Sequence, residues 1–162
     1  MDSDELLVHR KGPAYLRDQL LNEYHDVSLQ ASVGLNLIQD PRTEKVLDLD
    51  LPITSQRSHY QVADGYDKPV LSSLPTTWIL GFHKNLMDAR NIVVDDLCLI
   101  HLAFVSLEER VRRNRLWREY KLSEADSTFV NQSVRNDGTE QVKAELMDML
   151  NKGTIAAPAW LS

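Results

Sequence analysis

A strict alternation of apolar and polar residues between positions 27 and 37 constrains the fold of this chain more than any other feature. The apolar members occupy every odd position: Val27, Leu29, Ala31, Val33, Leu35 and Leu37. The even positions carry polar residues or glycine. Because successive side chains of a β-strand point to opposite faces, this pattern predicts one long strand with one buried and one wet face.

A second alternating segment predicts the partner of that strand. Asp40 and Pro41 suit the first two positions of a type I turn, and leucines then alternate with Asp48 and Asp50. We therefore expect an antiparallel hairpin, followed by a third strand in which large apolar residues share one face. The expected strands are 27–38 paired with 45–53, then 76–83 and, as a short addition, 59–62.

Helix signals occur near both ends of the chain. Pro13 suits the first position of a helix, because its φ is fixed at a helical value and its missing N–H would be unpaired there. This predicts a helix over 13–25. Near the C-terminus, Thr139 is a candidate N-cap and Gly153 a candidate helix end. A short helix is also compatible with 123–134.

The segment 92–121 admits two interpretations. Its apolar residues recur at helical spacing, which favours one long helix over 94–120. The part 97–105, however, is apolar on nearly every side, as a buried strand would be. Ser106 to Glu109 also matches a capping box that would begin a new helix after such a strand. We adopt the long helix and leave the strand as the alternative.

These elements predict a single α+β domain over residues 1–152, followed by an apolar C-terminal tail over 153–162. We expect an antiparallel sheet of three or four strands, covered on one face by the N-terminal helix, the long helix and the C-terminal helices. No internal repeat or shift in composition divides the chain further.

Composition excludes several classes of protein. One cysteine cannot build a disulfide framework or a Cys-based zinc site. No apolar run approaches the ~20 residues of a membrane-spanning helix. Charged residues interrupt the first 26 positions, so no secretory signal is expected there. We therefore expect a soluble intracellular protein in a reducing compartment such as the cytoplasm.

The net charge of −6 disfavours nonspecific attraction to nucleic acid or anionic lipid, yet one segment is basic. Between positions 106 and 121, six Lys or Arg residues stand against three Glu residues. The candidate binding residues in this segment are Arg110, Arg112, Arg113, Arg115, Trp117 and Arg118. Arginine forms bidentate contacts with carboxylate or phosphate, and aromatic rings stack on bases. The segment is therefore compatible with internal or subunit-bridging ion pairs, with an anionic protein partner, and with nucleic acid or lipid.

The C-terminal tail carries a second candidate interface at Trp160 and Leu161. An extended apolar peptide with an aromatic anchor is a common recognition element. The tail is also able to fold back and fill a groove on its own domain, and we favour that arrangement over contact with a neighbour.

Signals for catalysis are weak. Six dispersed glycines form no phosphate-binding loop. Cys98 and His101 form an isolated C-x-x-H motif inside an apolar run, where an inert buried thiol is expected. Asp48 and Asp50 would suit a hydrolase or a metal-dependent enzyme if the fold brought a histidine beside them; the simpler interpretation places both acids on the solvent face of a strand. The candidate histidines are His59 and His83.

The sequence therefore favours a non-enzymatic protein-interaction or assembly module that self-associates through the basic segment 110–121 and the C-terminal tail, with no cofactor or metal. Two alternatives stay open. One is RNA binding through the arginine-rich segment, and the other is a hydrolase or metal-dependent enzyme built on the two aspartates.

Overall fold

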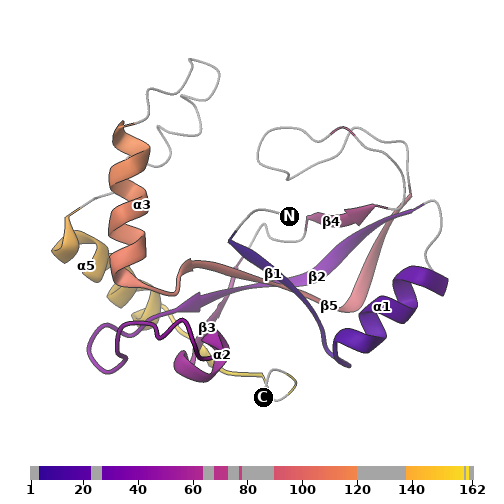
Figure 1. The fold of residues 1–162 in the computed structure, drawn as a ribbon, viewed down its shortest axis with the longest axis horizontal. Coiled ribbons are helices and arrows are strands. Elements are labelled where there is room, and N and C mark those ends of the chain that lie inside the picture. Colours follow the sequence, from indigo (N-terminus) through magenta and orange to yellow (C-terminus); the bar gives the residue numbers. More distant parts are fainter. Residues whose placement is uncertain are drawn as a thin grey trace.

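The computed structural model describes residues 4–22, 27–63, 68–72, 77, 90–119, 138–158 and 160. Within these residues the chain forms a mixed six-stranded sheet with four helices, which confirms the α+β class (Figure 1). The strands are β1 (Glu5–His9), β2 (Val27–Ile38), β3 (His59–Val62), β4 (Pro69–Ser72), β5 (Arg90–Phe104) and β6 (Ile155–Ala156). The helices are α1 (Pro13–Asn22), α2 (Ile53–Gln56), α3 (Leu107–Glu119) and α5 (Thr139–Asn151).

The sheet is mixed because its central pair is parallel. The strand order is β1-β5-β2-β3-β6, and β4 also pairs with β2. β5 runs parallel to β2, whereas the other pairs in the described sheet are antiparallel. The prediction of an antiparallel sheet of three or four strands is therefore wrong in the number of strands and in the direction of the central pair.

Strand β2 confirms the predicted strand over 27–38, but its partner differs from the prediction. β5 pairs along one edge of β2, while β3 and β4 share the other edge. Residues 45–53 have no edge of β2 to pair with, so the predicted hairpin is wrong. They form a loop that packs Leu47 and Ile53 against the core and leads into α2. The short strand expected at 59–62 is confirmed as β3.

The predicted long helix over 94–120 is wrong, and the strand alternative is confirmed. Residues 90–104 form β5, and a separate helix, α3, begins at Leu107. The change of structure occurs at Ser106, the first residue of the predicted capping box. The Glu109 N–H donates to the Ser106 hydroxyl oxygen over 3.3 Å, which satisfies one of the N–H groups that a helix start leaves unpaired.

Two core clusters lie on opposite faces of β5. Leu97 and Leu99 belong to the first cluster, Cys98 and Ile100 to the second, and neighbouring residues of a strand point to opposite faces. α1 contributes Leu16 to the cover of the first cluster. The loop after β2 and the C-terminal tail cover the second. A strand covered on both faces needs apolar residues at nearly every position, which explains the composition of 97–105.

The pairing of β2 with β5 is interrupted between the two clusters. The register shifts between Ala31 and Val33, opposite Val94 and Cys98. The Ser32 hydroxyl at this point lies 2.9 Å from the Asp95 carbonyl oxygen and 3.1 Å from that of Leu97. Its hydrogen bond therefore replaces backbone pairing that the irregularity removes.

The helices near the two ends agree with the sequence in most respects. α1 begins at Pro13 as expected and is described to Asn22. α5 begins one residue earlier than expected: Gly138 is its N-cap, and Thr139, the predicted N-cap, is the first helical residue. Gly153 follows the helix with a φ of +108°, a left-handed conformation that favours glycine. Figure 1 shows α3 and α5 side by side at one end of the sheet and α1 at the other.

Parts of three predicted elements lie outside the described residues. These are the strand over 76–83, of which Thr77 alone is described, the short helix over 123–134, and the last residues of the helix over 13–25.

The two-sided burial of β5 predicts where substitutions destabilise the protein. Ile100→Ala removes a fully buried side chain and should lower the free energy of unfolding by about 2–5 kcal/mol. Val93→Ala, on the same strand but 55% exposed, should lower it by less than about 1 kcal/mol. Urea unfolding of both variants measures the difference, and equal losses would contradict the burial of Ile100 in the second cluster.

Candidate interaction surface

The basic segment forms most of α3, and its first arginine serves the fold. Arg110 is buried, and its Nη2 lies 3.0 Å from Oε1 of Glu145 on α5. Its guanidinium also lies 4.5 Å from the ring centroid of Phe104, at the end of β5. A guanidinium held over an aromatic ring and paired with a carboxylate is stabilised by both contacts. Arg110 therefore joins α3 to α5 and to the sheet.

Arg113 anchors the same helix to the edge of the sheet. Its Nη1 lies 2.8 Å from Oδ2 of Asp4, immediately before β1. The same Asp4 oxygen lies 3.3 Å from Nε2 of His101, whose Nδ1 is 3.0 Å from Oδ1 of Asn36. This row of polar side chains crosses β1, β5 and β2. The hydrogen bond with His101 and the Arg113 guanidinium hold the pKa of Asp4 well below its usual range, against the opposing effect of burial.

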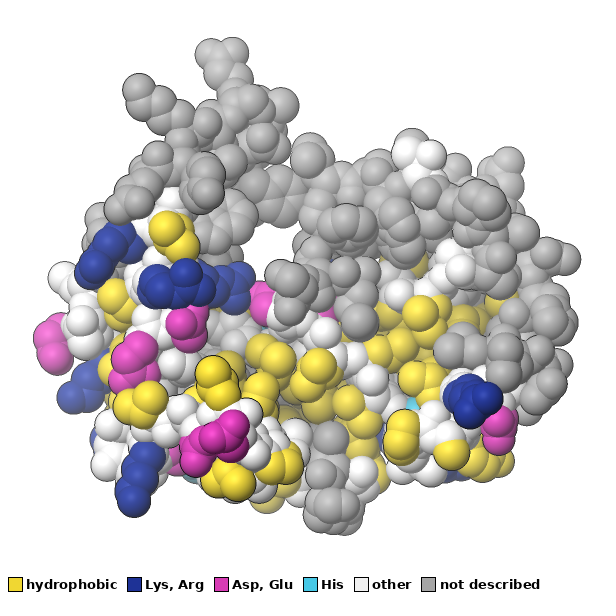
Figure 2. Space-filling view, viewed as in Figure 1, with side chains coloured by type: hydrophobic (Ala, Val, Ile, Leu, Met, Phe, Trp, Pro, Cys, Tyr) yellow, Lys and Arg dark blue, Asp and Glu magenta, His cyan; other side chains and the backbone are white. Residues whose placement is uncertain are grey.

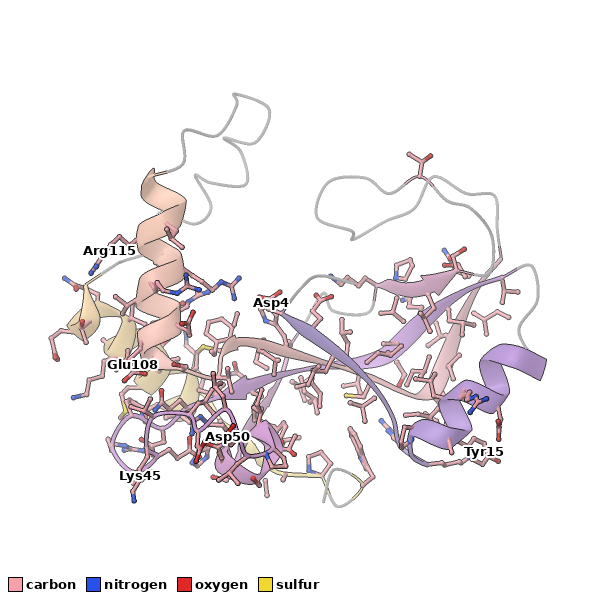
Figure 3. All side chains as sticks on the ribbon, viewed as in Figure 1. Asp4, Tyr15, Lys45, Asp50, Glu108 and Arg115 are labelled. Atoms are coloured by element: carbon pink, nitrogen blue, oxygen red, sulfur yellow. The ribbon has the colours of Figure 1, made fainter. Side chains whose placement is uncertain are left out.

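The outer face of α3 presents a different set of side chains. Arg112 pairs with Glu109 at 2.8 Å, and both side chains are more than half exposed. Arg115 and Leu116 are exposed one turn further on, and Arg115 forms no ion pair with any described residue. Figure 3 shows Arg115 pointing away from the sheet. Residues three and four apart share a helix face, so Arg112, Arg115 and Leu116 form one surface, here called the α3 face.

The other predicted binding residues either lie outside the description or pack internally. The side chains of Trp117 and Arg118 and the whole of Leu161 lie outside the described residues. Trp160 packs against the second core cluster, and the Arg10 guanidinium lies 5.8 Å from its ring centroid. β6 in the same tail pairs with β3. The described part of the tail therefore folds back onto its own chain.

The loop after β2 is built by polar side chains that bind its own backbone. The side-chain amide of Gln39 donates to the carbonyl groups of Glu44 and Lys45, while its Oε1 accepts from the Leu107 N–H over 2.7 Å. Gln56 donates to the Asp48 carbonyl over 2.8 Å and accepts from the Asp48 N–H over 2.7 Å. These contacts satisfy backbone groups that would otherwise pair in a sheet, so the loop is ordered without being a strand.

Residues 45–51 are here called the docking loop. Several of their aliphatic side chains face solvent, although the hydrogen bonds that order the loop do not involve them. Leu49 is 88% exposed, Val46 65% and Leu51 53%. Asp48 and Asp50 lie between them, and the Asp50 N–H donates to Oδ1 of Asp48 over 3.0 Å. Figure 2 shows hydrophobic and acidic side chains over this loop, below the Lys and Arg side chains that gather over α3, and Figure 3 shows Lys45 at the lower edge of the loop.

Sequence reasoning missed the docking loop because it assigned the leucines to the core face of a strand. One signal against that assignment was Pro52, which has no N–H to donate to a ladder. The polar row of Asp4, Asn36 and His101 was also missed, since these residues are far apart in sequence and meet only through the pairing of β1, β5 and β2.

Among the described residues, those considered for catalysis form no metal-binding or catalytic cluster. Cys98 is fully buried, and burial raises the pKa of its thiol to about 12. Asp48 and Asp50 are exposed in the docking loop rather than on a strand, and His59 is half-buried on β3. His83 lies outside the described residues. Across the described ranges, no three His, Cys, Asp or Glu side chains are grouped closely enough to hold a metal ion.

No family model, no curated protein and no solved structure matches this chain. Among the helices that the structure describes, none has both the length and the apolar composition needed to cross a bilayer.

The Asp4 contacts predict a pH-dependent stability. Asp4→Asn should lower the free energy of unfolding at pH 7 by about 1.5–3 kcal/mol, because it removes the charge that binds Arg113 and His101. Since the folded pKa of Asp4 is depressed, its contribution is complete above the unfolded pKa and is lost as the pH falls toward the folded value. The gap in the free energy of unfolding between wild type and variant should therefore shrink as the pH falls below about 4.

The exposed Asp18 provides the control for this experiment. Asp18→Asn should change stability by less than about 0.5 kcal/mol at any pH in the range. A gap between wild type and Asp4→Asn that widened as the pH fell below about 4 would contradict the contacts described for Asp4.

The buried thiol predicts an unreactive cysteine. In the folded protein at pH 7.5, Cys98 should react with a thiol-specific disulfide reagent far more slowly than in the urea-unfolded chain, because a protonated buried thiol is neither nucleophilic nor accessible. The measurement is the rate of chromophore release in each state. Equal rates would return Cys98 to consideration as a nucleophile.

Proposed function

We propose that this protein is a non-enzymatic protein-interaction module that binds its partner through the docking loop. The single observation that carries this proposal is the 88% exposure of Leu49 at the tip of a loop whose backbone is fixed by Gln39 and Gln56. Burial of a leucine side chain contributes about 1.5–3 kcal/mol, and this gain is not made within the described chain. An ordered loop also loses little conformational entropy when it binds.

The composition of the docking loop indicates what its partner presents. Three aliphatic side chains need an apolar contact, and the acids Asp48 and Asp50 that lie between them favour basic groups beside that contact. The partner surface that fits is therefore a patch of exposed aliphatic side chains with lysine or arginine beside it.

The RNA-binding alternative has less support than interaction with a protein. Arg110 and Arg113 pair with Glu145 and Asp4, so their charges are used within the chain. An RNA site built from the described part of α3 would depend on Arg112 and Arg115, in a chain whose net charge is −6. The enzyme alternative depends on Asp48 and Asp50, which lie in solvent.

The docking loop makes a prediction for protein capture. Immobilised wild type should retain specific proteins from a lysate of its own cells, and Leu49→Ser should reduce their recovery about tenfold, since the loss of about 1.4 kcal/mol of apolar contact corresponds to that factor. The measurement is quantitative mass spectrometry of the eluted proteins.

Val93→Ser serves as the matched control, because it places the same polar residue at another exposed aliphatic position. It should leave recovery unchanged. If Leu49→Ser and wild type retain the same proteins in the same amounts, the docking loop is not the binding surface.

A further inference from the structure

We propose that the partner of the docking loop is the α3 face of a second copy of this chain, so that two copies form a closed dimer. This inference rests on the proposed function and names the partner. It assigns a role to the outward arginines of α3, which the packing of the domain leaves exposed.

The α3 face has the composition that the docking loop requires. Leu116 supplies an exposed aliphatic side chain, and Arg112 and Arg115 lie beside it on the same helix face. The docking loop carries the opposite charge in its centre, where Asp48 and Asp50 lie between exposed aliphatic side chains; its one basic residue, Lys45, lies at its start. Apolar groups would therefore meet apolar groups, and Arg112 and Arg115 would meet Asp48 and Asp50.

The charges of the whole chain make such a contact specific. Two molecules that each carry a net charge of −6 repel one another, so association needs a region where opposite charges meet. Arg115 is suited to this because it forms no ion pair with a described residue. The Arg112–Glu109 pair is exposed on a helix surface, where ion pairs contribute little to the free energy of folding. Arg112 can therefore leave Glu109 for an acid of the second copy at little cost.

The positions of the two surfaces favour a twofold dimer over an open chain. Both surfaces are visible on the one face of the molecule drawn in Figure 2, with the docking loop below α3. Figure 3 shows the same separation between Asp50 and Arg115. A twofold axis that lies between two such surfaces brings each docking loop onto the α3 face of the other copy. The contact is then made twice, and the dimer is closed.

The experiment exchanges charges at Asp50 and Arg115. Both side chains are exposed, and neither forms a hydrogen bond or ion pair with a described residue, so their substitution should not disturb folding. In Asp50→Arg, an arginine meets Arg115 at both contacts; in Arg115→Glu, a glutamate meets Asp50 at both. Sedimentation equilibrium should show a dimer for wild type and a dissociation constant raised about tenfold or more for each variant.

The decisive sample is a mixture of the two variants. In a mixed dimer, the arginine introduced at position 50 of one chain meets the glutamate introduced at position 115 of the other, and the remaining contact is the original Asp50–Arg115 pair. The mixture should therefore form a heterodimer with an affinity near that of the wild-type dimer, and the Asp50→Arg/Arg115→Glu double variant should dimerise alone. Circular dichroism of each variant confirms that it is folded.

Two outcomes would overturn the inference. A wild type that stays monomeric up to high micromolar concentration shows that the partner is not a second copy; if Leu49-dependent capture persists, the proposed function stands and only this inference fails. A wild-type dimer that neither substitution weakens, or variants that do not recover on mixing, show that the two surfaces do not meet. If wild type neither dimerises nor captures proteins through Leu49, the proposed function fails as well.

Discussion

The burial of β5 on both faces is the constraint on which the rest of the structure depends. Leu97 and Leu99 face one core cluster while Cys98 and Ile100 face the other, so the strand must be central and needs cover on each side. Parallel pairing with β2 and antiparallel pairing with β1 fill its two edges. α1 then covers one face, and the loop after β2, together with the tail, covers the other.

This arrangement also positions the two surfaces of the proposed dimer. Because β5 ends at Phe104 and the capping box begins α3 soon afterwards, the helix stands at the end of the sheet, where Arg110 and Arg113 tie it down from one side. Its opposite side is left with exposed arginines. Because both edges of β2 are occupied, residues 45–51 are excluded from the sheet, and Leu49 faces solvent.

The sequence was informative where local chemistry decides the outcome. The alternation in β2, the proline at the start of α1 and the glycine after α5 were sufficient to place those elements. The sequence was misleading where the structure of a segment depends on pairing with residues far away in the chain. An apolar run such as 97–105 suits a buried helix and a buried strand equally, and 45–53 alternates like a strand although the positions it would pair with are taken. The arginines of the site could be found by composition, but not which of them are already paired.

The most direct test of the account is backbone NMR of residues 90–119. If β5 is the central strand, Leu97 to Ala103 should show strand-type chemical shifts, slow amide exchange, and nuclear Overhauser contacts that join Ile100 to Leu35 and His101 to Asn36 in a parallel pattern. Helical shifts that run without a break from residue 94 into α3 would contradict the account. Leu49 would then have an edge of β2 to pair with, and the surface on which the proposed interaction rests would not exist.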